Sequence, residues 1–397
     1  MILKTKDVVN KMKKKICIFT AHYLPYLGGV ENYTYNLSKT LVKQGDDVVI
    51  VTSNDMHLKV YEVQEGLLIY RMPCFNFMNG RIPILKVNKE FLQIQRRLKK
   101  YKFDLVLINT RFYPHTLYGV WLANKLGVRC IILDHGTSHI TVGNALADWS
   151  FSVAEHTITF LEKRFCRSFF GVSKACCEWL KHFRINAEGV LYNAVDIEKI
   201  DQLLENPVRD FRKEYNLQVD TRIIAYTGRL LKEKGVLELA EAVRTLPKEE
   251  NVYLFIAGDG EEMSEVKAVE STRIRALGRL SFAEVISLLS QADIYCLPTR
   301  YPEGFPTAVL EAAAAGCYVI TTDRGGSKEL IRDNSYGMIL DEPTPEKIRE
   351  AIKMALHDEI MRTEASEKAN QCVRENFVWS CTADKVHKLA DITGDNK

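Results

Sequence analysis

Short, almost wholly apolar runs alternate with stretches of helical period along this chain, and the alternation occurs twice. Apolar runs between helices are typical of parallel strands, because helices cover both faces of a parallel sheet. The expected strands are 16–21, 48–53, 67–71, 105–109, 130–134, 169–172 and 190–192, followed by 223–226, 253–257, 274–277, 294–297, 319–321 and 338–340. We therefore predict an α/β protein with two Rossmann-like, doubly wound parallel-sheet domains that face each other across a cleft.

The charged, helix-like segment 196–217 lies between the two series of strands. At 397 residues the chain is long enough for two domains that each bury a core. We place the N-terminal domain at 1–195, the C-terminal domain at 196–375, and a last helix at 376–397 that crosses back onto the N-terminal domain. In open sheets of this kind, ligands bind beyond the carboxyl ends of the strands.

Charge and cysteine content restrict the cellular setting. Residues 1–190 carry 27 Lys and Arg against 15 Asp and Glu, which favours an acidic partner or, equally, a solvated basic surface. The ten cysteines form no C-x-x-C pair and indicate reduced core residues of a cytoplasmic protein. Residues 1–15 are charged where a signal peptide is apolar, and no run approaches the ~18 apolar residues of a membrane span, so membrane contact is expected to be peripheral.

The segment 302–312 carries two glutamates, Glu303 and Glu311, with seven residues between them. Pro306 is typical of a first helical turn, which places Glu303 in the preceding loop and Glu311 inside the helix. The free N–H groups of a helix start bind anions. Carboxylates beside such an anion would repel bare phosphate, so we expect them to accept hydrogen bonds from attached hydroxyl groups. That combination describes a sugar nucleotide.

Two cations follow the first expected strand of the second domain. Arg229 and Lys234 lie between Gly228 and Gly235, at the edge of the sheet where ligands bind. Arginine bridges two phosphate oxygens and lysine supplies a compact charge. Solvated surface charge is the alternative, but the position favours a diphosphate, whose departure these cations would stabilise.

Three weaker signals lie at other strand ends. Gly28 and Gly29 precede a helical stretch and let backbone amides approach a phosphate, or form only a turn. His135 follows a buried strand and either donates a hydrogen bond to a ligand or has a structural role. Leu280 follows Gly278, where a base contact and a plain turn are both open. The chain has no P-loop, no H-E-x-x-H, and no acidic pair at a strand end, so no metal and no cofactor are expected.

These motifs resemble those of the retaining glycosyltransferases of family 4, which have the GT-B fold. The resemblance extends along most of the chain and rests on residues 28–31, 134–136, 192–196, 228–235, 258–260 and 303–311. One departure is Ala194, which stands where the family usually has glycine in Asn-Gly-Val-Asp.

The resemblance implies a role for each candidate residue. Arg229 and Lys234 hold the donor diphosphate, Glu311 binds the ribose, and Glu303 contacts the donor sugar near the reacting carbon. His135 lies against the transferred sugar and acceptor, so the catalytic candidates are Glu303 and His135. The remaining donor-binding candidates are Gly28, Gly29, Leu280, Phe305, Pro306, Thr307 and Ala308. The leaving phosphate itself takes the proton of the acceptor, so no protein nucleophile is required.

The expected function is transfer of a hexosyl or N-acetylhexosaminyl group, from a UDP-sugar, in cell-surface polysaccharide or glycolipid assembly. An epimerase or phosphorylase on the same GT-B plan is the alternative, and a non-catalytic sensor is disfavoured because both glutamates and both cations are present. A basic helix with Arg96–Arg97 and the apolar loop segments 75–78 and 82–85 predict a seat for a polyprenyl-linked acceptor on the inner face of the membrane. The alternative is that the apolar segments pack in the core and the basic face of the helix is solvated. No nucleic-acid partner is expected.

Overall fold

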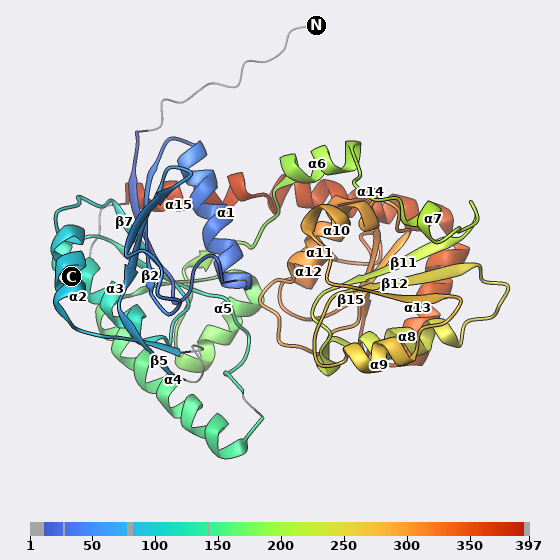
Figure 1. Ribbon diagram of the computed structural model, residues 1–397, viewed down its shortest axis with the longest axis horizontal. Coiled ribbons are helices and arrows are strands. Elements are labelled where there is room, and N and C mark those ends of the chain that lie inside the picture. The colour runs from blue at the N-terminus through green and yellow to red at the C-terminus, as the bar shows by residue number, and fades with distance from the viewer. Residues whose placement is uncertain (1–11, 27, 78–81, 142, 393–397) are drawn as a thin grey trace, which may run out of the picture.

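The protein consists of two α/β domains side by side, as a computed structural model shows for residues 12–26, 28–77, 82–141 and 143–392 (Figure 1). The sheet of the N-terminal domain has the strand order β10-β9-β8-β7-β1-β2-β4-β3, and every neighbouring pair is parallel except β3 with β4. Its strands are β1 (Lys15–Phe19), β2 (Asp47–Ser53), β3 (Tyr61–Gln64), β4 (Leu67–Met72), β7 (Leu105–Asn109), β8 (Cys130–Asp134), β9 (Ser168–Gly171) and β10 (Gly189–Val190).

The sheet of the C-terminal domain is wholly parallel, in the order β13-β12-β11-β14-β15-β16. Its strands are β11 (Arg222–Thr227), β12 (Val252–Ala257), β13 (Ile274–Gly278), β14 (Ile294–Leu297), β15 (Tyr318–Thr322) and β16 (Met338–Leu340). The strand order reverses direction beside β11, as in a doubly wound sheet. The predicted fold class is therefore confirmed.

Helices cover both faces of the sheets, which explains why their central strands are apolar throughout (Figure 1). The N-terminal domain has α1 (Gly29–Lys43), α2 (Lys89–Leu98), α3 (Pro114–Leu126), α4 (Ala145–Phe165) and α5 (Lys174–Leu180). The segment after the first domain forms α6 (Ile197–Glu205) and α7 (Phe211–Glu214), and the second domain has α8 (Val236–Arg244), α9 (Met263–Ala268), α10 (Phe282–Leu289), α11 (Thr307–Ala314), α12 (Ser327–Leu330), α13 (Pro345–His357) and α14 (Glu359–Asn376).

The last helix, α15 (Trp379–Asp391), lies on the N-terminal domain beside α1 (Figure 1). Trp379, Ala383 and Val386 are buried in the same apolar cluster as the central strands of the first sheet. Val195, where the chain enters the second domain, donates its N–H to the carbonyl of Phe377, where the chain leaves it (2.9 Å). The two connections between the domains therefore run side by side.

Two local expectations were wrong, and one strand was not predicted. Residues 61–64 form strand β3, which was not predicted, at the edge of the first sheet. The segments expected to be an apolar loop instead pair as an antiparallel hairpin of β5 (Cys74–Phe77) and β6 (Ile82–Leu85), although Met78 lies outside the described residues. Pro83 argues against a strand except at an edge, and Asn76, its partner in the hairpin, interrupts the apolar run of β5. Pro306 caps α11 and does not lie in its first turn.

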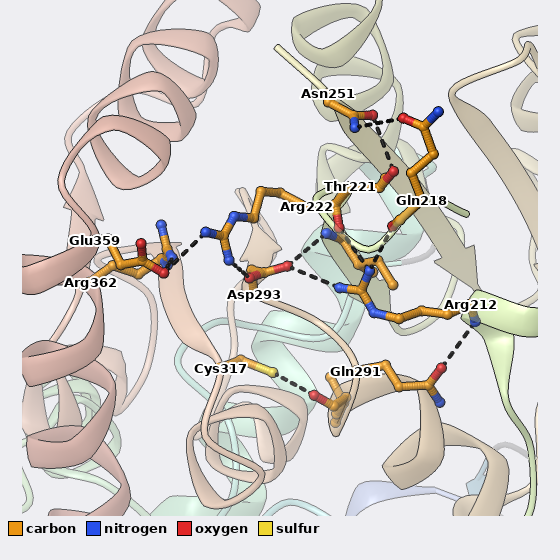
Figure 2. Close-up of polar contacts among 12 residues, drawn as sticks. Arg212, Gln218, Thr221, Arg222, Asn251, Gln291, Asp293, Cys317, Glu359 and Arg362 are labelled. Atoms are coloured by element: carbon orange, nitrogen blue, oxygen red, sulfur yellow. Dashed lines mark hydrogen bonds and ion pairs between the residues drawn. The ribbon is translucent and has the colours of Figure 1, made fainter.

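An ion-pair network lies at the amino ends of β11 and β14, the opposite sheet edge from the interface between the domains (Figure 2). Asp293 accepts hydrogen bonds from Arg222 Nη1 (2.8 Å) and from the N–H of Ile223 (2.9 Å). Arg222 also reaches Glu359 of α14 (3.0 Å). The carboxylate of Asp293 therefore links β14 to β11 and, through Arg222, to α14.

Replacing Asp293 with alanine is expected to destabilise the protein by about 2 kcal/mol, because an N–H group and a guanidinium lose their shared acceptor. Chemical denaturation measures the change. The matched control is Glu359→Ala, whose side chain is 66% exposed and whose loss should cost less than about 1 kcal/mol. Equal costs for the two variants would contradict the central place of Asp293.

Candidate functional site

The loops after β8 and β14 contact each other across the interface between the domains. Thr137 Oγ1 donates to the carbonyl oxygen of Glu303 (3.0 Å), and Asn193 Nδ2 donates to that of Phe305 (3.0 Å). A Cβ on Gly304 would lie 2.2 Å from the carbonyl oxygen of His135, so only glycine permits this approach. The predicted segment 303–306 therefore lies directly against the N-terminal domain.

Lys234 and Glu303 form an ion pair, and each side chain is only 12% exposed. The Tyr301 ring lies beside both predicted cations, with its centroid 5.0 Å from Lys234 Nζ and 5.7 Å from Arg229 Cζ. Gly235 has φ +72, and a Cβ there would lie 2.3 Å from the carbonyl oxygen of Pro298. Because only glycine fits this turn, the backbone after β11 packs closely on the loop after β14, which holds Lys234 against Glu303.

A cavity of about 270 Å³ lies between the domains, next to the start of α11. Glu311 lines it, and its carboxylate accepts no hydrogen bond from any residue that the structure describes. Burial raises the pKa of Glu311 to about 7. Thr307 also lines the cavity, and Thr307 and Ala308 begin the helix, so their N–H groups have no partner within it. Hydroxyl and phosphate groups suit these unsatisfied acceptors and donors.

His135 lies at the end of β8 and is held by its neighbours. Its Nε2 lies 3.1 Å from Asn109 Oδ1, and its ring packs edge-on against Tyr33 (4.8 Å between centroids). Because Asn109 Nδ2 donates to Thr34 Oγ1 (2.8 Å), the oxygen of Asn109 faces the ring and His135 Nε2 carries the proton. Burial lowers the pKa of His135 to about 3, so the ring is neutral. Nε2 therefore donates to Asn109, which favours a structural role for this N–H, and Nδ1 is left to accept. Contact of His135 with a ligand stays a prediction.

Gly28 and Gly29 have different reasons to be glycine. A Cβ on Gly28 would lie 2.2 Å from the carboxylate of Glu31, a buried residue in the first turn of α1. Gly29 lines the cavity, and a Cβ there would meet nothing within 4 Å. A side chain at position 28 would thus displace the carboxylate of Glu31, whereas Gly29 leaves space on the cavity side.

The structure does not bring every candidate together. Of the predicted residues, Gly29, Thr307 and Glu311 line the cavity, whereas Arg229, Lys234, Glu303, His135 and Leu280 do not. Leu280 packs against the core of the C-terminal domain, and Phe282, which was not predicted, lines the cavity. Phe305 and Pro306 are buried, so their side chains are not available to a ligand. Sequence reasoning missed five residues at or beside the site: Asn109, Thr137, Phe282, Tyr301 and Trp379. The position of Asn109 at the end of a buried strand was the one usable signal.

Comparison with known proteins agrees with this geometry. Residues 27–199 match the family model described as Glycosyltransferase Family 4, and residues 207–372 match Glycosyl transferases group 1. TuaC of Bacillus subtilis strain 168, a proposed glycosyltransferase of teichuronic acid biosynthesis, is 31% identical over 82% of this chain and 81% of its own. The phosphatidylinositol N-acetylglucosaminyltransferase GPI3 subunit of Saccharomyces cerevisiae strain YJM789 is 26% identical over 94% of this chain and 82% of its own.

Among solved structures, Anabaena HepE in complex with UDP superposes with a TM-score of 0.73 at 16% identity, covering 96% of this chain and 100% of that one. The two facing domains, with the candidate site between them, define a glycosyltransferase of the GT-B fold. The chain belongs to glycosyltransferase family 4.

Proposed function

We propose that this glycosyltransferase moves a hexosyl or N-acetylhexosaminyl group, with retention, from a UDP-sugar to a saccharide or lipid-linked acceptor of a cell-surface polysaccharide or glycolipid. The observation that carries the proposal is the juxtaposition of Lys234, Arg229 and Glu303 at the end of the second sheet. Similar proteins support the proposed donor and the proposed sugar. The HepE structures contain UDP or UDP-glucose, and GPI3 is named an N-acetylglucosaminyltransferase.

The basic side chains of the site bind the diphosphate, and the acidic side chains orient the sugar and the ribose. Lys234 has three N–H donors, so it can keep Glu303 and still donate to a diphosphate, while Arg229, which is exposed, can turn to bind the same group. The two cations stabilise the negative charge that develops on the diphosphate, and we expect no metal or other cofactor for the transfer itself. Glu303 and Glu311 accept hydrogen bonds from hydroxyl groups of the sugar and the ribose.

In the proposed step, the bond between the anomeric carbon and the diphosphate oxygen breaks, and the acceptor oxygen bonds to that carbon on the same face. The proton of the acceptor passes to the diphosphate oxygen that leaves. His135 is neutral, with Nδ1 as its acceptor, so its proposed role is to orient a hydroxyl group and not to supply a proton.

The experiment that tests the function is a screen of nucleotide sugars by thermal shift, followed by transfer assays with the donor that stabilises the protein. We expect UDP release only when an acceptor is added, and a product with the anomeric configuration of the donor, read by NMR. Interconversion of UDP-sugars without an acceptor would instead identify an epimerase, and sugar phosphate as product a phosphorylase.

The surface of α4 supports contact with a membrane. The helix buries polar residues, Glu155, Thr159 and Glu162, against the domain. Its exposed face carries Leu146, Trp149, Val153 and Phe160 at helical spacing, with the polar residues Ser150, His156 and Thr157 between them. An apolar stripe of this kind on the outside of a basic domain is typical of a helix that lies in a membrane interface. Among the described residues, no helix is both long and apolar enough to span a membrane.

We expect the protein to sediment with anionic lipid vesicles at low salt, and Trp149→Glu to weaken this binding at least about 10-fold, because Trp149 is 66% exposed on that face. The matched control is Ile360→Glu, since Ile360 is 74% exposed on α14 of the other domain. Equal binding of both variants, or no sedimentation of the wild type, would contradict the membrane role of α4.

A further inference from the structure

Three histidines from separate elements converge on the surface of the N-terminal domain. His139 lies in the loop after β8, His156 lies in α4, and His182 lies in the short helix 181–183 that follows α5. One ring nitrogen of each lies within 4.8 Å of the other two, and Nε2 of His139 is 3.1 Å from Nε2 of His182. No metal was expected, because the chain has neither H-E-x-x-H nor an acidic pair at a strand end. These three histidines, far apart along the chain, match no such motif.

The ring of His139 is oriented by a buried carboxylate. Glu155 Oε2 lies 2.6 Å from His139 Nδ1, so Nδ1 donates to Glu155 and Nε2 faces His182 with its lone pair. Glu155 is itself held in place by Arg111, a buried residue. A histidine whose second nitrogen donates to a carboxylate is the arrangement that proteins use to present imidazole to a metal ion.

We propose that His139, His156 and His182 form a binding site for a divalent transition-metal ion, with Zn²⁺ as the best match. In a tetrahedral site with bonds of about 2.0 Å, ligand nitrogens are about 3.3 Å apart, close to the separation of His139 and His182. His156 and His182 are exposed, so rotation of their side chains brings the third nitrogen into range. Three imidazoles suit Zn²⁺, Ni²⁺ or Cu²⁺ and not Mg²⁺ or Ca²⁺, which require oxygen ligands. The fourth position is left for water.

The site would fix the loop that carries candidate residues of the transferase. His139 is linked through Glu155 to Arg111, and Arg111 Nε donates to Asp134 Oδ2 (2.8 Å). Asp134 Oδ1 in turn accepts the N–H of His135 (3.0 Å). Asp134 therefore holds one end of segment 135–139, and a metal ion bound to His139 would hold the other. The segment includes Thr137 at the domain interface. The role of the ion is to position this loop, and no step of transfer passes through it.

Zn²⁺ titration of the chelator-treated protein, in competition with a chromophoric chelator, tests the site. We expect one Zn²⁺ per chain, no competition by Mg²⁺ or Ca²⁺, and a loss of affinity of at least about 100-fold in His156→Ala and His182→Ala. The matched control is His357→Ala, which removes an exposed histidine of α13 and should leave affinity unchanged. Absence of stoichiometric binding, or equal affinity in all three variants, would overturn the proposal.

Two readouts locate the ion without any substrate. The Trp179 ring stacks on His182 (4.8 Å between centroids), so Cu²⁺ or Ni²⁺ should quench tryptophan fluorescence, and Trp179→Phe should remove most of the quenching. Zn²⁺ should also slow hydrogen exchange in segment 135–141. Quenching that survives Trp179→Phe would place the ion elsewhere, and unchanged exchange would overturn the coupling to the loop. Since none of these measurements involves transfer, their failure would leave the glycosyltransferase assignment untouched.

Discussion

Glu303→Ala is expected to lower the rate of transfer at saturating donor by at least about 100-fold, while the affinity for the donor stays the same or rises. Glu303 is the ion-pair partner of Lys234, and the two side chains are nearly buried together. Its removal frees Lys234 to bind the diphosphate alone, so donor binding is not lost. What is lost is the acceptor that orients the sugar at the reacting carbon. The expected signature is therefore a lower kcat without a higher KM.

Lys234→Ala provides the comparison. This variant removes the charge that stabilises the leaving diphosphate, so both kcat and donor affinity should fall. Glu303→Gln keeps an acceptor oxygen without the charge and should lie between wild type and Glu303→Ala. Circular dichroism and thermal unfolding show whether each variant is folded at the assay temperature. Unchanged turnover in Glu303→Ala would remove the basis of the proposed mechanism.

Much of the fold could be predicted because parallel strands are distinctive. β7, β8, β14 and β16 have the predicted bounds, since they are short apolar runs between clear helices. The hairpin of β5 and β6 could not be predicted, because Asn76 and Pro83 interrupt its two apolar segments. Local pattern therefore identifies strands that are short apolar runs, the edge strand β16 included, and fails where polar residues or proline interrupt the run, as in β3, β5 and β6.

The site was predictable where residues lie at strand ends or a helix start, as with Arg229, Lys234 and Glu303. Their pairing was not, because the contact of Lys234 with Glu303 depends on Gly235 fitting against Pro298, which only the folded backbone shows. Phe282 and Trp379 look like any core residue in the sequence, and reach the cavity because two loops and the last helix meet there. A local sequence pattern does not show which loops, far apart along the chain, come into contact in the fold.

Affinity for a UDP-sugar is expected to fall as the pH drops through about 7, by up to about 10-fold for each pH unit. Burial raises the pKa of Glu311 to about 7, whereas donor hydroxyl groups bind the ionised carboxylate. Below that pH, binding must first remove a proton from Glu311. An intact UDP-sugar is the suitable probe, since it lacks the terminal phosphate of UDP, which titrates in the same range. Calorimetry between about pH 5.5 and about pH 8 measures the effect.

Glu311→Gln should remove this pH dependence and weaken donor binding about 10- to 100-fold at about pH 8, because charge-assisted hydrogen bonds are lost.

The same variant should raise the stability of the folded protein. A carboxyl whose folded pKa is raised from 4.5 to about 7 is favoured in its protonated form, so its ionisation destabilises the folded protein progressively across that interval. The glutamine variant should thus match wild type near about pH 4 and exceed its stability, by on the order of 3 kcal/mol at most, above about pH 7. Such a variant, more stable and less able to bind donor, would identify Glu311 as a residue kept for its ligand at the expense of the fold. A flat pH profile of wild-type affinity would exclude the ionised form of Glu311 from donor binding, and a glutamine variant less stable than wild type at about pH 8 would contradict the raised pKa of Glu311.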